Sequence, residues 1–139
     1  FFAIFLRQKK RDNKNKKIEE MKTIQITLQD FKNKITDLDS NEFKYKGDKP
    51  AIIDFYASWC GPCRSLAPTL EQLAQKYDGD LYIYKVDTEQ EQQLAAMFGI
   101  VSIPTMIFIP MEGMPTMTQG ALPKEEIEKI INQVLLINK

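Results

Sequence analysis

The stretch "YASWCGPCRSLAP", residues 56–68, holds the only two cysteines of the chain, Cys60 and Cys63. Just before it, "AIIDFYA" (51–57) is a nearly continuous apolar run rich in β-branched and aromatic residues. Such a run predicts a central strand that is buried on both faces. Apolar residues at helical spacing then predict a helix over residues 62–77. The two thiols are therefore expected where a buried strand gives way to a helix.

Working outward, strands and helices are expected to alternate along the chain. The remaining strands are expected at residues 22–26, 81–87, 103–110 and 116–120. The remaining helices are expected over 28–35, after a capping box of Thr27 and Asp30, then after one of Thr88 and Glu91, and from Pro123 onward. Helical crossovers favour parallel pairing and a terminal hairpin adds antiparallel strands. The pattern predicts an α/β fold, a three-layer α/β/α sandwich with a central mixed five-stranded sheet flanked by four helices.

The length and the charge distribution indicate one globular domain and a basic tail. The chain has 139 residues with 19 basic and 19 acidic side chains, so it is neutral as a whole. Residues 1–20 carry seven of the basic side chains, and residues 21–139 hold 12 basic and 16 acidic ones. This acidic balance gives the domain no electrostatic footprint for nucleic acid. We expect residues 1–20 to lie outside the fold and residues 21–139 to form the domain.

The tail bears on the location of the protein. "FFAIFL" is apolar and "RQKKRDNKNKK" after it is basic, the reverse of the order in a secretory signal. We expect a disordered tail, or sequence upstream of a true start at Met21, and a cytoplasmic protein. The alternative is a truncated membrane anchor, whose following basic residues favour the cytoplasmic side, or a periplasmic protein. No apolar run is long enough for a membrane-spanning helix.

Three kinds of chemistry use two cysteines that are two residues apart. A structural zinc site needs four nitrogen or sulfur ligands, and this chain has two cysteines and no histidine. A structural disulfide across so short a loop removes little entropy from the unfolded chain. A redox pair has positive support, because a C-x-x-C motif just after a strand in a βαβ unit is typical of redox sites. We therefore expect no metal.

The position of the cysteines suggests a different role for each. Cys60 is expected at the start of the helix, where free N–H groups and the helix dipole stabilise a thiolate and lower its pKa. Cys63, one turn further and expected to be more buried, suits a resolving thiol. Between them, Gly61 allows a close approach of another backbone and Pro62 stiffens the loop.

With its flanks, "WCGPC" resembles the thioredoxin family, and the resemblance covers residues 22–137. The matching positions are Asp54, Trp59, Pro68, Lys85, the "SIPT" segment with Pro104, Gly113, Gly120 and Ala121. The resemblance implies that Asp54 is a buried proton acceptor for Cys63 and that Lys85 tunes it. A merely structural polar residue is the alternative for Asp54, and a lysine that reaches solvent is the alternative for Lys85.

By the same resemblance, a docking surface for target peptides surrounds the thiols. It implies a cis peptide bond before Pro104 and a backbone edge at Ile103 for an extended target. The residues expected to bind substrate are Trp59, Gly61, Pro62, Ile103, Pro104, Gly120 and Ala121.

The resemblance implies a thiol–disulfide oxidoreductase, a protein-disulfide reductase that acts through a mixed disulfide. Cys60 would be the nucleophile and Cys63 the resolving thiol. The expected partners are disulfide-containing proteins and thioredoxin reductase or another upstream dithiol donor, with a monomeric protein and no bound cofactor. Two alternatives stay open: an accessory interaction module with idle thiols, and a periplasmic reductant with a dedicated target.

Overall fold

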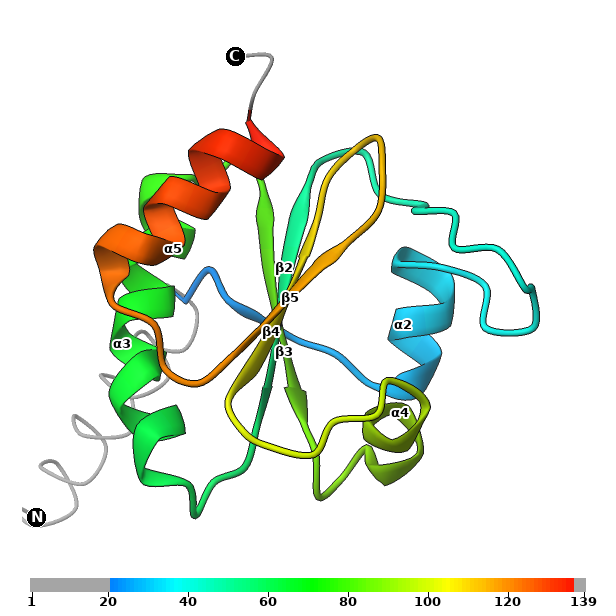
Figure 1. Ribbon diagram of the computed structural model, residues 1–139, viewed down its shortest axis with the longest axis horizontal. Helices are drawn as coiled ribbons and strands as arrows, with labels where there is room; N and C mark the ends of the chain where they lie inside the picture. Colours follow the sequence, from blue (N-terminus) through cyan, green and yellow to red (C-terminus); the bar gives the residue numbers. More distant parts are fainter. Residues whose placement is uncertain (1–20, 137–139) are drawn as a thin grey trace, which may run out of the picture.

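The computed structural model describes residues 21–136, and the expected tail over 1–20 lies outside the described residues. Strands and helices alternate in the order predicted from the sequence (Figure 1). In chain order they are β1 (Ile24–Gln25), α2 (Leu28–Lys34), β2 (Ala51–Tyr56), α3 (Gly61–Lys76), β3 (Tyr82–Asp87), α4 (Gln92–Met97), β4 (Thr105–Ile109), β5 (Thr116–Gln119), α5 (Lys124–Ile130) and the π-helical segment η1 (Ile131–Leu135). Within residues 21–136, no helix has both the length and the apolar character that crossing a membrane requires.

The five strands form one mixed sheet in the order β1-β3-β2-β4-β5. Helical crossovers join β1, β2 and β3, which run parallel, whereas β4 is antiparallel to both β2 and β5. Strand β2 is therefore central, as its apolar sequence predicts. In the register of the sheet, Asp54 of β2 lies opposite Lys85 of β3 and Met106 of β4. The predicted three-layer α/β/α sandwich is confirmed.

Helices cover both faces of the sheet, with α3 and α5 on one side and α2 and α4 on the other (Figure 1). Alternation along β2 divides its side chains between two cores. Ile52 packs with Leu66, Leu70 and Ile127 on the α3 and α5 side. Ile53 and Phe55 pack in the opposite core, whose members from the helices include Phe31 and Leu94. Because neighbouring side chains alternate, Asp54 lies on the same face as Ile52, beneath α3.

The start of α4 differs from the sequence prediction. The capping box of Thr27 and Asp30 is present at α2, but the one expected from Thr88 and Glu91 is wrong. Thr88 lies in the turn directly after β3 and is bonded to the end of β2, because its hydroxyl donates to the carbonyl of Tyr56 at 3.0 Å. Helix α4 begins later, after Glu91, without a side-chain cap.

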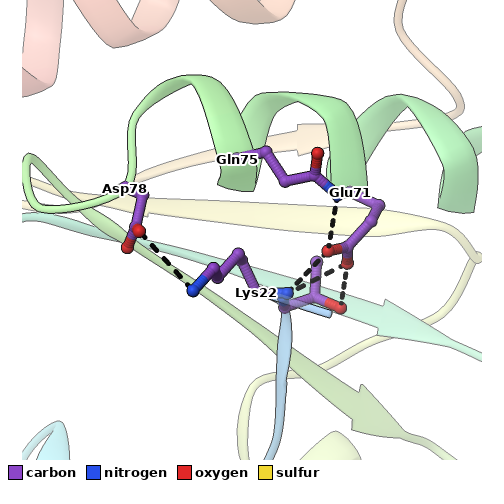
Figure 2. A network of polar contacts seen from close by, with 5 residues as sticks. Lys22, Glu71, Gln75 and Asp78 are labelled. Carbon is purple, nitrogen blue, oxygen red and sulfur yellow. Dashed lines mark hydrogen bonds and ion pairs between the residues drawn. The ribbon is translucent and has the colours of Figure 1, made fainter. Parts of the chain in front are cut away.

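A carboxylate on α3 holds the start of the fold in place (Figure 2). Glu71 accepts hydrogen bonds from the backbone N–H of Lys22 at 2.6 Å, and from the N–H and hydroxyl of Thr23 at 3.2 and 2.8 Å. Gln75 donates to it at 3.5 Å, and the ammonium of Lys22 lies 3.7 Å from Asp78. Burial acts to raise the pKa of Glu71, but these hydrogen bonds outweigh it and the pKa is lowered. The ionised form therefore stabilises the attachment of β1.

Replacing Glu71 by alanine is expected to lower the free energy of unfolding by about 1–2 kcal/mol, because hydrogen bonds to a charged group are lost. Since the folded-state pKa is depressed, this contribution is present above the unfolded pKa and is lost as the pH falls through the folded one. Denaturant unfolding at pH 7 and pH 3 measures both effects. Gln75→Ala, which removes only the 3.5 Å contact, is the control and should change little. An equal loss at both pH values would contradict this account of Glu71.

Candidate active site

The two cysteines lie at the junction of β2 and α3. Cys60 is the N-cap residue of α3, with extended backbone at φ −81° and ψ 115°. Its Sγ accepts a hydrogen bond from the backbone N–H of Cys63 at 3.2 Å. Gly61 and Pro62 form the first turn, where proline removes no helical hydrogen bond. The sulfur of Cys60 is thus the group that meets the free N–H groups of the helix, as the sequence predicts.

In this structure the cysteines form a disulfide bond, with Cα atoms 5.2 Å apart. The two cysteines are therefore close enough to convert between a disulfide and two thiols. Cys63 was expected to be the more buried of the two, and in this disulfide form the difference is small, since Cys60 is 5% exposed and Cys63 is 4% exposed. Both pack in a small cluster with Ala57, against Tyr56 and Ile103. Position along the helix, rather than burial, distinguishes them.

The segment before β4 lies beside the disulfide. The peptide bond between Ile103 and Pro104 is cis, as expected. The carbonyl oxygen of Ile103 lies 3.9 Å from Sγ of Cys60. The backbone N–H of Gly120 donates to the carbonyl of Pro104 at 2.8 Å, which brings Gly120 and the exposed Ala121 to the same region. Residues far apart in the sequence thus meet around Cys60.

Trp59 presents its ring to solvent directly before Cys60. Its side chain is 65% exposed, and its indole N–H donates to the carboxylate of Glu89. The loop after β3 places Glu89, because Asp87 Oδ1 accepts the backbone N–H of Glu89 at 2.9 Å. The sequence did not single out Glu89, since an exposed glutamate after a strand carries no distinctive pattern. Gly61 and Pro62 are exposed next to Trp59.

Asp54 is buried in the central strand with only 1% of its surface exposed. Neither of its carboxylate oxygens has a hydrogen-bond partner among residues 21–136. Burial raises the pKa of Asp54 to about 6, and the charge of Lys85 acts in the opposite direction. The carboxyl group can therefore exchange a proton close to neutral pH.

Lys85 lies opposite Asp54 in the register, but its ammonium is placed over an aromatic ring. The Nζ atom is 4.5 Å from the centroid of Tyr56. The hydroxyl of Tyr56 in turn donates to Gln25 of β1 at 2.9 Å. In the sequence, Tyr56 is distinguishable only as the last aromatic residue of an apolar run. Its place next to a charged residue becomes visible only when the strands are paired.

Comparisons with known proteins agree on one family. A family model described as Thioredoxin matches residues 22–133. The chain is similar to the thioredoxin of Borreliella burgdorferi, with 45% identity over 109 residues, which are 78% of this chain and 93% of that protein. It is also similar to the thioredoxin of Haemophilus influenzae, with 41% identity over 100 residues, 71% of this chain and 92% of that protein.

A solved structure has the same arrangement. Chloroplastic thioredoxin z, whose crystal structure is described as defining a novel type-specific target recognition, superposes with a TM-score of 0.69. The match has 33% sequence identity and covers 81% of this chain and 94% of that chain.

Proposed function

Since this chain belongs to the thioredoxin family, we propose that Cys60 attacks the disulfide of a target protein and that Cys63 releases the reduced target. The protein is a thiol–disulfide oxidoreductase, a protein-disulfide reductase. The single observation that supports this order of events is the location of Cys60 at the N-cap of α3, with its sulfur accepting the N–H of Cys63.

The reaction transfers two electrons to the target. The Cys60 thiolate attacks one target sulfur, a new S–S bond joins Cys60 to the target, and the other target sulfur leaves as a thiolate that takes up a proton. Cys63 then loses its proton and its thiolate attacks Cys60. The Cys60–Cys63 disulfide forms, and the second target sulfur leaves and is protonated. The family implies that a reductase restores the dithiol.

The geometry supports Cys60 as the attacking thiolate. The negative charge of a thiolate at an N-cap is stabilised by the helix dipole and by direct N–H donors, and one such donor is already aimed at this sulfur. Cys63 lies inside the helix, where its own N–H is the donor and the dipole acts less strongly.

Asp54 is the proposed proton acceptor for Cys63, with Lys85 tuning it. Its burial on the α3 face supports this, because an unpartnered carboxyl group with a pKa of about 6 can take a proton near neutral pH. The register partner Lys85 adds a positive charge that favours the ionised form. These two residues lie on neighbouring central strands that end near the thiols.

The proposed docking surface is made of the residues that meet around the disulfide. Exposed Trp59, the rim at Gly61 and Pro62, and the backbone of Ile103 support the binding of an extended target peptide. Half-buried Gly120 and exposed Ala121 extend this proposed surface, whereas Pro104, expected to be part of it, is buried in this form.

The state of assembly and the location are proposals of the same kind. We expect a monomer that receives electrons from thioredoxin reductase or another upstream dithiol donor, and a cytoplasmic location. Size-exclusion chromatography with light scattering tests the first expectation, and fractionation of the native cells tests the location.

Insulin reduction with dithiothreitol as the electron source tests the function. The protein is expected to turn over insulin much faster than dithiothreitol alone, because the Cys60 thiolate is formed near neutral pH. A rate equal to that of dithiothreitol alone would favour the binding module with idle thiols over the reductase.

A further inference from the structure

We infer that Tyr56 is a positioning residue for the proton transfer: its ring holds the ammonium of Lys85 at the sheet surface beside Asp54, so that Asp54 is ionised when Cys63 has to lose its proton. This inference rests on the proposed role of Asp54 as the proton acceptor. It assigns to Tyr56 a task that neither the strand pattern nor the cysteine motif indicates.

The side chains of Asp54, Tyr56 and Lys85 lie on the same face of the sheet. Asp54 and Lys85 are register partners on adjacent parallel strands, and Ile52 and Ile83, two residues before each, pack in the same core beneath α3. Tyr56, two residues after Asp54, also lies on this face. The ammonium of Lys85 therefore has four possible surroundings on this face: the carboxylates of Asp54 and Asp87, the ring of Tyr56, and solvent.

The ammonium of Lys85 lies over the ring of Tyr56 and not against the carboxylate of Asp54. The Nζ atom of Lys85 lies 4.5 Å from the ring centroid, within the range of a cation–π interaction. The ion pairs found within residues 21–136 do not include Lys85 with Asp54. Lys85 is half-buried, so the ring retains the ammonium near the sheet instead of releasing it to solvent.

The ring of Tyr56 is held in place by a hydrogen bond and by packing. The hydroxyl of Tyr56 donates to Gln25 on the edge strand β1 at 2.9 Å, and the ring packs against the cluster of Ala57, Cys60 and Cys63. Tyr56 thus packs against the cluster that contains the redox pair and also lies beneath the ammonium of Lys85. This hydrogen bond, which reaches across β3 to the edge strand, restricts the rotation of the ring.

Few other charges act on Asp54 from the elements around it. The titratable groups on its face in residues 21–136 are Lys85 and Asp87 from β3, Tyr56 from β2, Tyr77 at the end of α3 and the two cysteines at the start of α3. Asp87 acts on Tyr56, whereas the charge that acts on Asp54 is that of Lys85. The facing residues on β1, β4 and α5 are uncharged, and they are Gln25, Met106 and Ile127. The position of the Lys85 ammonium is therefore the main electrostatic variable, and its charge already acts to lower the pKa of Asp54.

The test is an NMR titration of the Asp54 side-chain carboxyl carbon in the oxidised protein of residues 1–139. Lys85→Met and Tyr56→Leu are each expected to raise the pKa of Asp54 from about 6 by about one pH unit, since a nearby positive charge is removed or released to solvent. Tyr56→Phe keeps the ring and is expected to keep the pKa close to that of the unaltered protein.

The double variant decides whether Tyr56 acts through Lys85. In a Lys85→Met background, Tyr56→Leu is expected to add no further rise, because no ammonium is left to hold. A full second rise would overturn the inference, as would an unchanged or lowered pKa in Tyr56→Leu, or a Tyr56→Phe protein that behaves like Tyr56→Leu. If Tyr56→Leu does not fold, Gln25→Ala releases the ring from an exposed position and should raise the pKa in the same direction; no rise would overturn the inference.

The pH profile of insulin reduction gives a second readout. In Tyr56→Leu the acid limb of the profile should move to higher pH together with the pKa of Asp54. If Tyr56→Leu reduces insulin but neither its acid limb nor its Asp54 titration moves, only this inference is contradicted and the proposed function stands. If the unaltered protein does not reduce insulin at all, the proposed function is contradicted, whatever the titration shows.

Discussion

Replacing Cys60 or Cys63 by serine is expected to lower the rate of insulin reduction to that of dithiothreitol alone. The reaction needs both thiols, because one forms the mixed disulfide and the other breaks it. No further cysteine exists in the chain to take over either step. Measured turnover therefore cannot distinguish the two variants, although they are blocked at different steps.

Single-turnover experiments with reduced protein separate the two blocks. Cys63→Ser keeps the N-cap thiol and should react once with a target disulfide, whereas Cys60→Ser should react slowly, because the remaining thiol lies inside α3. Arg64→Ala, an exposed change in the same turn of the helix, is the matched control for the handling of the protein. Equal single-turnover rates for the two serine variants would contradict the assignment of distinct roles.

Replacing Asp54 by alanine is expected to stabilise the oxidised protein at pH 7 to 8 by about 1–3 kcal/mol. The folded-state pKa of about 6 is higher than the ordinary value of 3.8, so the fold disfavours the ionised carboxyl. A difference of about two pH units corresponds to about 3 kcal/mol, and the space left by the carboxyl group reduces the gain.

The sign of the pH dependence follows from proton binding. Between about pH 4 and pH 6 the folded protein retains the Asp54 proton that the unfolded chain has lost, so stability falls as the pH rises through this window. The alanine variant lacks this fall. Its advantage should be full above about pH 6 and should vanish below about pH 4, which denaturant unfolding at several pH values measures. A variant that is less stable at pH 8 would show that Asp54 is a structural residue.

The same substitution should reduce turnover near neutral pH. Loss of a positioned proton acceptor is expected to slow the resolving step by about 10²-fold, which is the lower end of the typical range. The difference should become smaller at alkaline pH, where Cys63 loses its proton to the solvent without help. Asp54→Asn, which keeps the shape of the side chain but cannot accept the proton, is the matched control. It should be as slow as alanine, and normal turnover by either variant would remove Asp54 from the mechanism.

Much of this fold is predictable because its signals are local. The apolar run of β2, the cysteine pair at its end and the capping box at Thr27 each depend on a few neighbouring residues. The cis bond before Pro104 followed from a family resemblance and not from a propensity, since such bonds are rare at proline.

The parts that were missed depend on contacts across the sheet. Thr88 has the local pattern of a helix cap, but its hydroxyl is bonded to the strand that contains Tyr56. Glu89 and Gln25 are ordinary exposed residues until pairing places them beside Trp59 and Tyr56. The two cysteines are buried almost equally because the disulfide packs both of them into one cluster, which the sequence alone does not indicate.

The central claim, that Cys60 attacks and Cys63 resolves, is tested most directly by the mixed disulfide that Cys63→Ser accumulates with a disulfide-containing protein. Peptide mapping by mass spectrometry under non-reducing conditions identifies the bond. The account predicts a stable covalent complex joined through Cys60, which dithiothreitol releases, and very little complex from Cys60→Ser. Rapid accumulation of an equally stable complex through Cys63 in the Cys60→Ser protein would contradict it.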